Sequence, residues 1–245
     1  MRRFLRTIRE RLENAGPYSF KGVQLINLLR SLPRWPKESF SQKAEDLLIP
    51  KLLGKSKGRY LDIGSYHPVI YSNTHKLFKA GWNGVNVDMS EETISAFRRF
   101  RPKDNNVCAA LGDKTEQRTG FFMENGKKSP LNTLCKDTAK EWASTFGKNI
   151  LKRPVSVFSL DDLFVKIDEN PESIEFLNID IEGLDWTVLK QWPFSNARPK
   201  VICIEDHASS VDQVITSDTH LLLRDNNYQL KYWLSPSLLY EKVDK

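Results

Sequence analysis

The sequence predicts an α/β fold in which helices flank a mostly parallel β-sheet. From Gly58 onward, short apolar segments with the character of strands alternate with helical segments, as in βα units joined by right-handed crossovers. The tail over residues 228–243, "YQLKYWLSPSLLYEKV", has the pattern of a terminal strand pair, which would add an antiparallel edge. The chain has 245 residues, 40% of them hydrophobic, which suffices for one large domain with a small extension.

The first part of the chain predicts helices only. Apolar residues at helical spacing within residues 4–12 predict a basic amphipathic first helix, and residues 23–32 predict a second one. Ser41 has the residue type of an N-cap and opens a third helix, "KAEDLLIPKLL". We therefore expect a helical extension over residues 1–40 and the main domain over residues 41–245.

The expected strands of the main domain are short and rich in apolar or β-branched residues. They are "RYLDIG" (59–64), "GVNVD" (84–88), "NNVCAAL" (105–111), "IEFLNID" (174–180) and "KVICIE" (200–205). The helical segments "NTHKLFKAG" (73–81) and "EETISAFRRF" (91–100) separate the first three strands. From Gly112 to about Pro154 the pattern predicts a long, polar, irregular insert.

Carboxylates mark the ends of these strands. Asp62 lies in the first strand, and the others close or follow a strand: Asp88, Asp113, Asp180, Glu182, Glu205 and Asp206. Carboxylates at buried strand ends lose hydration, so they are usually kept ionised by a metal, an arginine, a backbone amide or a ligand. Ligands of parallel sheets bind beyond the carboxyl ends of the strands, near the switch in strand order, so this pattern predicts a site there.

The turn after the first strand, "DIGSYHP", indicates which ligand the site takes. It lacks the G-x-G-x-x-G of a dinucleotide site, and Pro68 stands where a following helix would need free amides. An acidic strand followed by one close-approach glycine, Gly64, suits a ligand with a cationic amino-acid end. Asp88 would accept two hydrogen bonds from a ribose diol. Together these features indicate S-adenosylmethionine.

Two blocks of the sequence carry a resemblance to a known family. "YLDIGSYHPVIYSNTHKLFKAGWNGVNVD", followed by "FLNIDIEGLDWTVLKQWPFSNARPKVICIED", resembles the FkbM family of S-adenosylmethionine-dependent O-methyltransferases. The resemblance runs from about Gln42 to the C-terminus. It implies a class I methyltransferase (Rossmann-like) fold with a seven-stranded sheet and one reversed edge strand. Members of the family commonly methylate hydroxyls of sugars in cell-surface glycans, or of natural products.

The resemblance also assigns residues to the cofactor. It gives Asp62, Gly64 and Ser65 to the methionine end and Asp88 to the ribose. The residues Ser72, Asn73 and Thr74 match the family's "SNT" segment, which would hold the cofactor carboxylate at a helix N-terminus. Asp113 would meet the adenine amino group. The alternative for Ser72 or Thr74 is a role as helix N-cap.

Methyl transfer to an aliphatic hydroxyl needs a general base or a divalent cation that lowers the hydroxyl pKa. Asp180, Glu205 and Asp206 offer three oxygen ligands that suit Mg²⁺ or Mn²⁺. This arrangement is similar to that of catechol O-methyltransferase and of metal-dependent macrolide-sugar methyltransferases. Either Asp180 or Glu182, or both, would face the metal. The alternative makes Glu182 a helix-start acid and Asp206 a cap.

Histidines are the other candidates for proton transfer. His207 directly follows the acid pair, and His67 lies in the loop after the first strand, so each could accept the hydroxyl proton. Asp180 completes the set of expected catalytic residues. His75 and His220 fall on predicted helices, where we expect them to be structural or exposed.

The insert over residues 114–154 is polar but contains Phe121, Phe122 and Trp142, which could stack on a sugar or close over the cofactor. Long inserts in compact domains are usually functional or disordered. We therefore expect a substrate lid, with a surface loop of no chemical consequence as the alternative.

Charge and cysteine content bear on partners and location. The net charge is +6, with five arginines in the first eleven residues. Residues 1–16 could lie on an anionic membrane surface, or pack one stripe on the domain. The basic residues are not interleaved with aromatics in a nucleic-acid-binding module, so we expect no nucleic acid partner. Three cysteines at unrelated spacings and the lack of a long apolar run suit the cytoplasm, with possible peripheral contact on the inner membrane face.

The leading hypothesis is an O-methyltransferase acting on a sugar hydroxyl of a cell-surface or lipid-linked glycan. A second enzyme hypothesis is methylation of a small natural product in solution. A third is a cofactor-binding protein that no longer catalyses and serves as a scaffold. The missing glycines argue against a nicotinamide oxidoreductase. The sequence does not indicate the oligomeric state.

Overall fold

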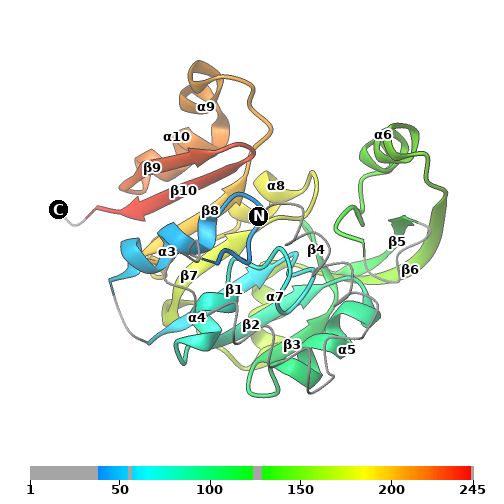
Figure 1. Ribbon diagram of the computed structural model, residues 1–245, viewed down its shortest axis with the longest axis horizontal. Helices are drawn as coiled ribbons and strands as arrows, with labels where there is room; N and C mark the ends of the chain where they lie inside the picture. The colour runs from blue at the N-terminus through cyan, green and yellow to red at the C-terminus, as the bar shows by residue number, and fades with distance from the viewer. Residues whose placement is uncertain (1–37, 55–56, 124–128, 244–245) are drawn as a thin grey trace, which may run out of the picture. The chain divides into compact units, whose positions relative to one another are not determined.

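The fold is described from a computed structural model (Figure 1). It describes residues 38–54, 57–123 and 129–243. Apart from residues 38–40, the expected helical extension lies outside the described residues, and with it the basic helix proposed to contact membranes. No helix of the described part is both long and apolar enough to cross a membrane.

Seven strands of the unit Ser39–Lys245 form one sheet. In spatial order they are β3 (Asn105–Cys108), β2 (Asn83–Asp88), β1 (Arg59–Ile63), β7 (Ile174–Ile179), β8 (Val201–Glu205), β10 (Ser237–Lys242) and β9 (Tyr228–Leu234). The strands from β3 to β8 are parallel to their neighbours, whereas β10 is antiparallel to both β8 and β9. The prediction of a mostly parallel, seven-stranded sheet with a reversed edge strand is confirmed, and with it the class I methyltransferase (Rossmann-like) fold.

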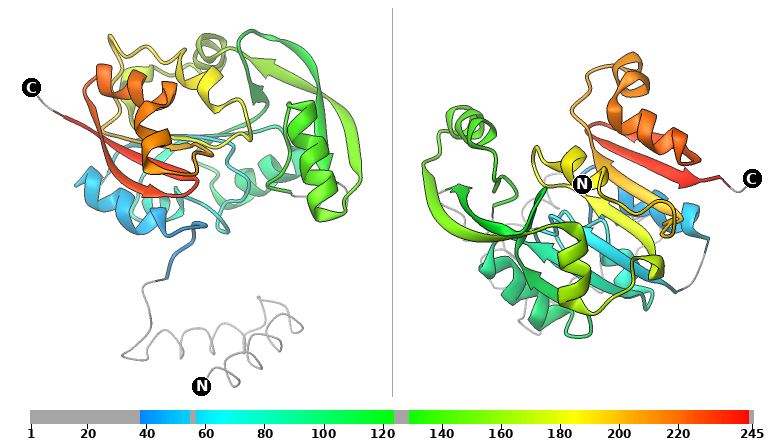
Figure 2. Two further views of the ribbon diagram at one scale, coloured as in Figure 1. Left: turned by 90° about the horizontal axis from the view of Figure 1, so that it is seen from above. Right: turned by 180° about the vertical axis from the view of Figure 1, so that it is seen from behind.

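Helices lie on both sides of this sheet (Figure 2). They are α3 (Glu45–Leu53), α4 (His75–Lys79), α5 (Glu91–Phe100), α6 (Lys136–Phe146), α7 (Leu160–Ile167), α8 (Asp185–Leu189), α9 (Val211–Thr216) and α10 (Asp218–Asp225), with a 3₁₀ turn η1 (Pro171–Ser173). The helix expected from Ser41 begins at Glu45, and the Ser41 hydroxyl accepts a hydrogen bond from the backbone N–H of Asp46.

Alternation along the strands divides the apolar side chains between two cores. Leu61 and Ile63 of β1 point to one face, where they share a core with buried residues of α7, α8, α9 and α10. Tyr60 points to the other face and packs with buried residues of α3 and α4. Asp62 follows Tyr60 by two residues, so it also faces α3 and α4. The same alternation places Asn178 of β7 and Glu205 of β8 on that face, because they follow the buried Phe176 and Cys203 by two residues.

The expectation that the insert is irregular is wrong. It contains β5 (Glu116–Met123), α6 and the start of β6 (Ile150–Phe158), and β5 pairs with β6 over the whole length of β5. Figures 1 and 2 show β5, β6 and α6 together on the side of the sheet away from β9 and β10. Pro154 is tolerated in β6 because the third strand of this small sheet, β4 (Ala110–Leu111), pairs with β6 only at Val157 and Phe158.

The single strand expected over residues 105–111 is also corrected. The chain leaves the large sheet after Cys108 and enters the small one as β4 at Ala110. Between them, the backbone N–H of Ala109 donates to the carbonyl of Asp88. This change of sheet brings the small sheet to the carboxyl end of β2, which is where the site was expected.

Candidate functional site

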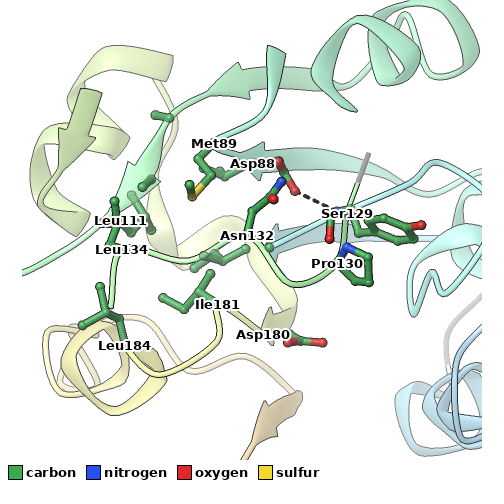
Figure 3. Close-up of a pocket in the computed structure, with 16 residues that line it drawn as sticks. Asp88, Met89, Leu111, Ser129, Pro130, Asn132, Leu134, Asp180, Ile181 and Leu184 are labelled. Atoms are coloured by element: carbon green, nitrogen blue, oxygen red, sulfur yellow. Dashed lines mark hydrogen bonds between the residues drawn. The ribbon is translucent and has the colours of Figure 1, made fainter. Parts of the chain in front are cut away.

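A cavity lies at the carboxyl ends of β1, β2 and β7 (Figure 3). It holds about 520 Å³ of empty space, part of it open to solvent. Asp88 and Asp180 are its two carboxylates (Figure 3). Gly64 also lines it and follows β1, the strand between β2 and β7. Most of the remaining lining is apolar, including Leu111 and Ile181. A cavity of this kind, at the switch between β1 and β7 in the strand order, fits a nucleoside-like ligand.

Asp88 is held by the backbone around it. One carboxylate oxygen accepts from the N–H of Tyr66 at 3.0 Å and the other from the N–H of Ser90 at 2.8 Å. Burial raises the pKa of Asp88 to about 6, although these two hydrogen bonds act in the opposite direction. Each oxygen still has a lone pair to accept from a ligand hydroxyl, so Asp88 lies where the predicted ribose ligand should be.

Gly64 has a structural reason to be glycine. Its φ is +83°, and a Cβ built there would lie 1.6 Å from the backbone oxygen of Asp180. The close approach expected between Gly64 and a ligand is therefore an approach between the ends of β1 and β7. Ser65 is buried, and its hydroxyl donates to the carbonyl of Val87.

The "SNT" segment and Asp62 form a buried polar network beneath the cavity. The carboxylate of Asp62, 2% exposed, accepts from Thr74 at 2.7 Å and from Asn178 at 2.8 Å. Asn73 donates to Asn178 at 2.9 Å, and the Ser72 and Thr74 hydroxyls lie 3.3 Å apart. Neither hydroxyl caps α4, because the Thr74 side chain forms no cap hydrogen bond. None of these residues lines the cavity.

Arg101 organises this network, and the sequence prediction missed it. Its side chain is 1% exposed and donates to the Ser72 and Thr74 hydroxyls and to the Pro68 carbonyl. A signal was present, since Arg101 follows the buried Phe97 by four residues and so continues the inward face of α5.

Asp113, expected at the adenine, lies elsewhere. It is exposed in the bend after β4 and is absent from the cavity lining, which at this point is formed by Ala109, Ala110 and Leu111.

A second, open groove adjoins the cavity. Its lining includes three aromatic side chains, Tyr71, Trp142 and Phe146. Pro130 lines both the cavity and the groove. The rings of Tyr71 and of Tyr66, which lines the cavity, stack with centroids 6.0 Å apart.

The insert contributes to both spaces, which the sequence did not specify. Ser129, Asn132 and Leu134 line the cavity, and Trp142 and Phe146 of α6 line the groove. The substrate lid stays a prediction. Phe121 and Phe122 are buried in β5 instead and line neither space.

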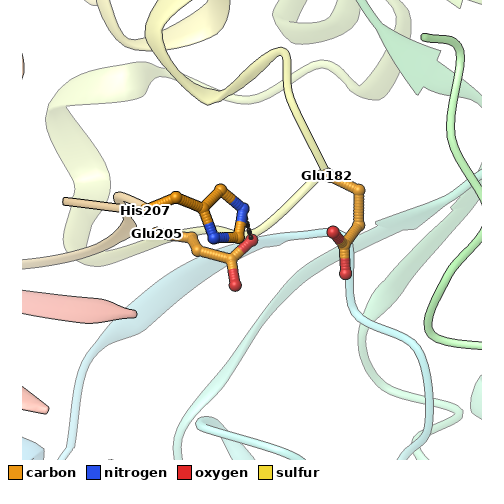
Figure 4. A group of neighbouring side chains, drawn as sticks. All are labelled: Glu182, Glu205 and His207. Atoms are coloured by element: carbon orange, nitrogen blue, oxygen red, sulfur yellow. Dashed lines mark ion pairs between the residues drawn. The ribbon is translucent and has the colours of Figure 1, made fainter. Parts of the chain in front are cut away.

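Acidic side chains gather where the cavity and groove meet. Glu182, Glu205 and His207 each place one potential ligand atom within 4.8 Å of the others, and Figure 4 shows Glu182 on one segment and Glu205 with His207 on another. Asp180 is adjacent, partly buried, and lines the cavity. Burial and the nearby carboxylate of Glu205 raise its pKa well above the usual range of an aspartate.

The same causes act on the two glutamates. Burial, followed by the charge of Asp180, raises the pKa of Glu182 to about 8. Burial, followed by the charge of Glu182, raises the pKa of Glu205 to about 8. Each glutamate also has one buried oxygen, Oε2, that forms no hydrogen bond. Orphaned buried acceptors of this kind fit a bound cation.

Of the predicted metal ligands, Asp206 does not belong to this group. Its carboxylate accepts from the backbone N–H of Ala208 at 3.0 Å, which closes a local turn, and the helix-cap alternative is wrong because Ser210 caps α9. Alternation explains the difference, because Glu205 and His207 point to one side of the chain and Asp206 to the other.

The histidines differ in their surroundings. His207 lines the groove with a side chain 60% exposed, and its Nε2 lies 3.6 Å from the Glu205 carboxylate. His67 accepts from the N–H groups of Val69 and Ile70 through Nδ1 and lines neither space. His75 contacts the Pro68 carbonyl, and burial lowers its pKa to about 4.

Comparisons with known proteins were made for the whole chain. The Methyltransferase FkbM domain matches residues 62–230, which is more than half of the chain. Among solved structures, an O-methyltransferase from Bacillus cereus in complex with SAH is similar, with 11% identity, 97% of each chain covered and a TM-score of 0.38. No curated protein matches.

Proposed function

Because the chain belongs to the FkbM methyltransferase family, we propose that it transfers a methyl group from S-adenosylmethionine to a sugar hydroxyl of a cell-surface or lipid-linked glycan. The main support is that the cavity and the groove adjoin at one cluster of acidic side chains. Asp180 lines the cavity and Glu182 lines the groove, two residues further along the chain. A donor in one space and an acceptor in the other would meet at these carboxylates.

The cavity supplies the contacts that an adenosine ligand needs. Asp88 would hold the ribose hydroxyls, and the apolar side chains of Met89, Leu111 and Leu134 would pack on the adenine. Asp180 would attract the cationic end of the ligand. S-adenosylmethionine supplies, when bound, a methyl group on a positively charged sulfur.

The groove supplies the contacts that a sugar needs. Tyr71, Trp142 and Phe146 offer aromatic faces on which sugar C–H groups can pack. The indole N–H of Trp142 is buried without a hydrogen-bond partner, so it can donate to a sugar oxygen. Polar groups of the acid cluster lie beside them. This combination of aromatic faces and hydrogen-bonding groups favours a sugar over a purely apolar acceptor.

In the proposed reaction, the acceptor oxygen forms a bond to the methyl carbon as the carbon–sulfur bond breaks. The electron pair of that bond stays on sulfur, and the hydroxyl proton must leave. Asp180 can take the proton because burial and its neighbours raise its pKa, which makes it a stronger base. His207, which lines the groove, is the alternative acceptor. A divalent cation at the strand-end acids would lower the hydroxyl pKa as well.

The cofactor is tested by calorimetric titration of S-adenosylmethionine and S-adenosylhomocysteine. We expect wild type to bind both. Asp88→Ala should weaken binding by about 10- to 100-fold, the loss expected for hydrogen bonds to a charged group. Asp113→Ala is the matched control, since Asp113 is exposed and outside the cavity. Absence of binding to wild type would overturn the methyltransferase proposal and favour a scaffold.

The acceptor is tested by a transfer assay with radiolabelled cofactor. Sugar nucleotides and glycans form one arm, and small hydroxylated natural products form the other. Turnover confined to the second arm would overturn the sugar assignment. Trp142→Ala should raise KM for a sugar acceptor with little change in the affinity for the cofactor.

For location, we propose a cytoplasmic enzyme with residues 1–16 resting on the inner membrane face. Deletion of these residues should release the protein from anionic liposomes without loss of turnover on soluble acceptors. Equal liposome binding by the full and shortened chains would refute the membrane contact.

A further inference from the structure

The ends of β7 and β8 bring together two carboxylates and one imidazole. Glu182 comes from the loop after β7, whereas Glu205 ends β8 and His207 follows it. One oxygen of each glutamate and one ring nitrogen of His207 all lie within 4.8 Å of one another. Side chains from separate elements that converge this closely can share one ion (Figure 4).

In the described part of the chain, the two carboxylates have no lysine or arginine side chain to balance them. Oε2 of Glu182 and Oε2 of Glu205 are buried and form no hydrogen bond. Among the described residues, no lysine or arginine forms an ion pair with either glutamate, and the basic group paired with Glu205 is the His207 imidazole, whose Nε2 lies 3.6 Å from Oε2. Buried carboxylates in this condition are paired or coordinate metals.

The loop that carries Glu182 is fixed by its surroundings. Glu182 has a φ of 54°, an uncommon conformation for a residue other than glycine. The Asp185 carboxylate accepts from the N–H groups of Ile181 and Gly183, and Thr133 donates to the Glu182 carbonyl at 2.8 Å. The structure therefore holds an unfavourable backbone conformation at the residue that points into the cluster, as sites that bind ligands do.

The donor set indicates the class of ion. Mg²⁺ prefers oxygen ligands, whereas sites that add an imidazole to carboxylates suit first-row transition metals such as Mn²⁺. We propose that Glu182, Glu205 and His207 form a three-ligand site for a divalent transition metal, with Mn²⁺ as its representative, whose open positions face the acceptor groove. This proposal deepens the proposed function and rests on it for the role of the ion, which is to orient the acceptor hydroxyl. It makes His207 a metal ligand and not the proton acceptor.

The test measures metal binding directly, without cofactor or acceptor. The full chain is stripped with EDTA, and Mn²⁺ binding is followed by electron paramagnetic resonance of the free ion. We expect one Mn²⁺ per chain, bound more tightly than Mg²⁺ in competition. Glu182→Gln, Glu205→Gln and His207→Gln should each weaken binding at least about 10-fold. Asp206→Asn is the matched control, because the Asp206 carboxylate accepts a local hydrogen bond from the backbone N–H of Ala208 and lies outside the cluster. This variant should bind Mn²⁺ like wild type.

Several outcomes would overturn the assignment. These are no Mn²⁺ binding by wild type, Mg²⁺ binding as tight as Mn²⁺, unchanged binding in His207→Gln, or weakened binding in Asp206→Asn. Circular dichroism and thermal melting of each variant separate loss of a ligand from loss of the fold. The cofactor titration is independent of this result. Cofactor binding without Mn²⁺ binding refutes the metal site alone, and Mn²⁺ binding without cofactor binding refutes the proposed function.

Discussion

Two polar clusters lie close together on the same face of the large sheet, and their hydrogen bonding differs. The first surrounds Arg101 and includes Asp62 and Asn178, and it lies beneath the cavity. The second consists of Asp180, Glu182, Glu205 and His207 at the strand ends. Both contain buried carboxylates, so burial and residue type alone do not separate them.

The Arg101 cluster satisfies its own carboxylates. Asp62 accepts two side-chain hydrogen bonds, and Asp104 accepts from Tyr60, Asn86 and the backbone of Gly84. Burial raises the pKa of Asp62, and the hydrogen bond from Thr74 and the positive charge of Arg101 oppose that rise. Only the Nε of Arg101 forms no hydrogen bond.

The acid cluster lacks such compensation. Burial and the neighbouring carboxylates raise the pKa values of Asp180, Glu182 and Glu205, and Oε2 of each glutamate is buried without a hydrogen bond. The comparison teaches that a buried polar group with its partners supplied by the chain stabilises the fold, whereas one without them indicates a ligand. Three substitutions test this distinction.

The largest expected effect on stability is at Arg101. Arg101→Met should lower the free energy of unfolding by about 3–5 kcal/mol, because it leaves the carboxylates of Asp62 and Asp104 buried without a balancing charge. Urea denaturation measures the change. Arg99→Met is the control, since Arg99 lies two residues before Arg101 and its side chain is exposed. Its replacement should change the free energy of unfolding by less than about 0.5 kcal/mol. Similar values for both variants would show that the Arg101 network does not stabilise the fold.

The second effect is a pH dependence from the acid cluster. The pKa values of Glu182 and Glu205 rise from 4.5 to about 8, so the folded protein binds their protons more tightly than the unfolded chain does. In metal-free protein, the two glutamates should therefore contribute most to the free energy of unfolding below pH 4.5. This contribution should be lost as the pH rises through 8. Glu205→Gln should make this decrease in the free energy of unfolding smaller by on the order of 2 kcal/mol.

Unfolding free energies at several pH values between 5 and 9 check this prediction. Glu172→Gln is the control, because Glu172 is exposed in η1 and its replacement should leave the slope unchanged. A wild-type protein whose stability rises with pH over this range in the presence of EDTA would contradict the assignment. Added Mn²⁺ should oppose the loss at high pH, because it binds the ionised carboxylates.

Much of the fold was readable from the sequence because its strands are continuous apolar segments between helices. β1, β7 and β8 lie within the expected ranges, and β2 begins one residue before its expected range. The insert was missed for a physical reason. β5 alternates exposed and partly buried residues in its first half and is buried throughout its second half, so it has no single period. Its pairing with β6 joins segments far apart in the chain, and no local pattern reports such a pairing.

The site was predictable where the strand ends determine it. Asp88, Gly64 and Asp180 line the cavity because ligands of parallel sheets bind at the carboxyl ends of strands. The contributions of Ser129 and Asn132 were not predictable, since they depend on how the insert folds back. The division of the acids between Glu205 and Asp206 follows from strand alternation, which holds through His207 although β8 ends at Glu205.

The smallest expected effect on stability is at Thr133, a residue of the insert that hydrogen-bonds to the loop carrying Glu182. The Thr133 hydroxyl is buried, donates to the Glu182 carbonyl and accepts from the backbone N–H of Cys135 at 2.9 Å. Thr133→Val keeps the shape but removes both hydrogen bonds, and should cost about 1–3 kcal/mol of unfolding free energy. Thr119→Val is the control, because Thr119 is exposed on β5 and its replacement should be nearly neutral. If the insert positions Glu182, Thr133→Val should also weaken Mn²⁺ binding while the control does not. A loss of stability with unchanged Mn²⁺ affinity would assign Thr133 to the structural class of polar groups, together with Arg101, and would show that Asp185 alone is sufficient to hold the Glu182 loop.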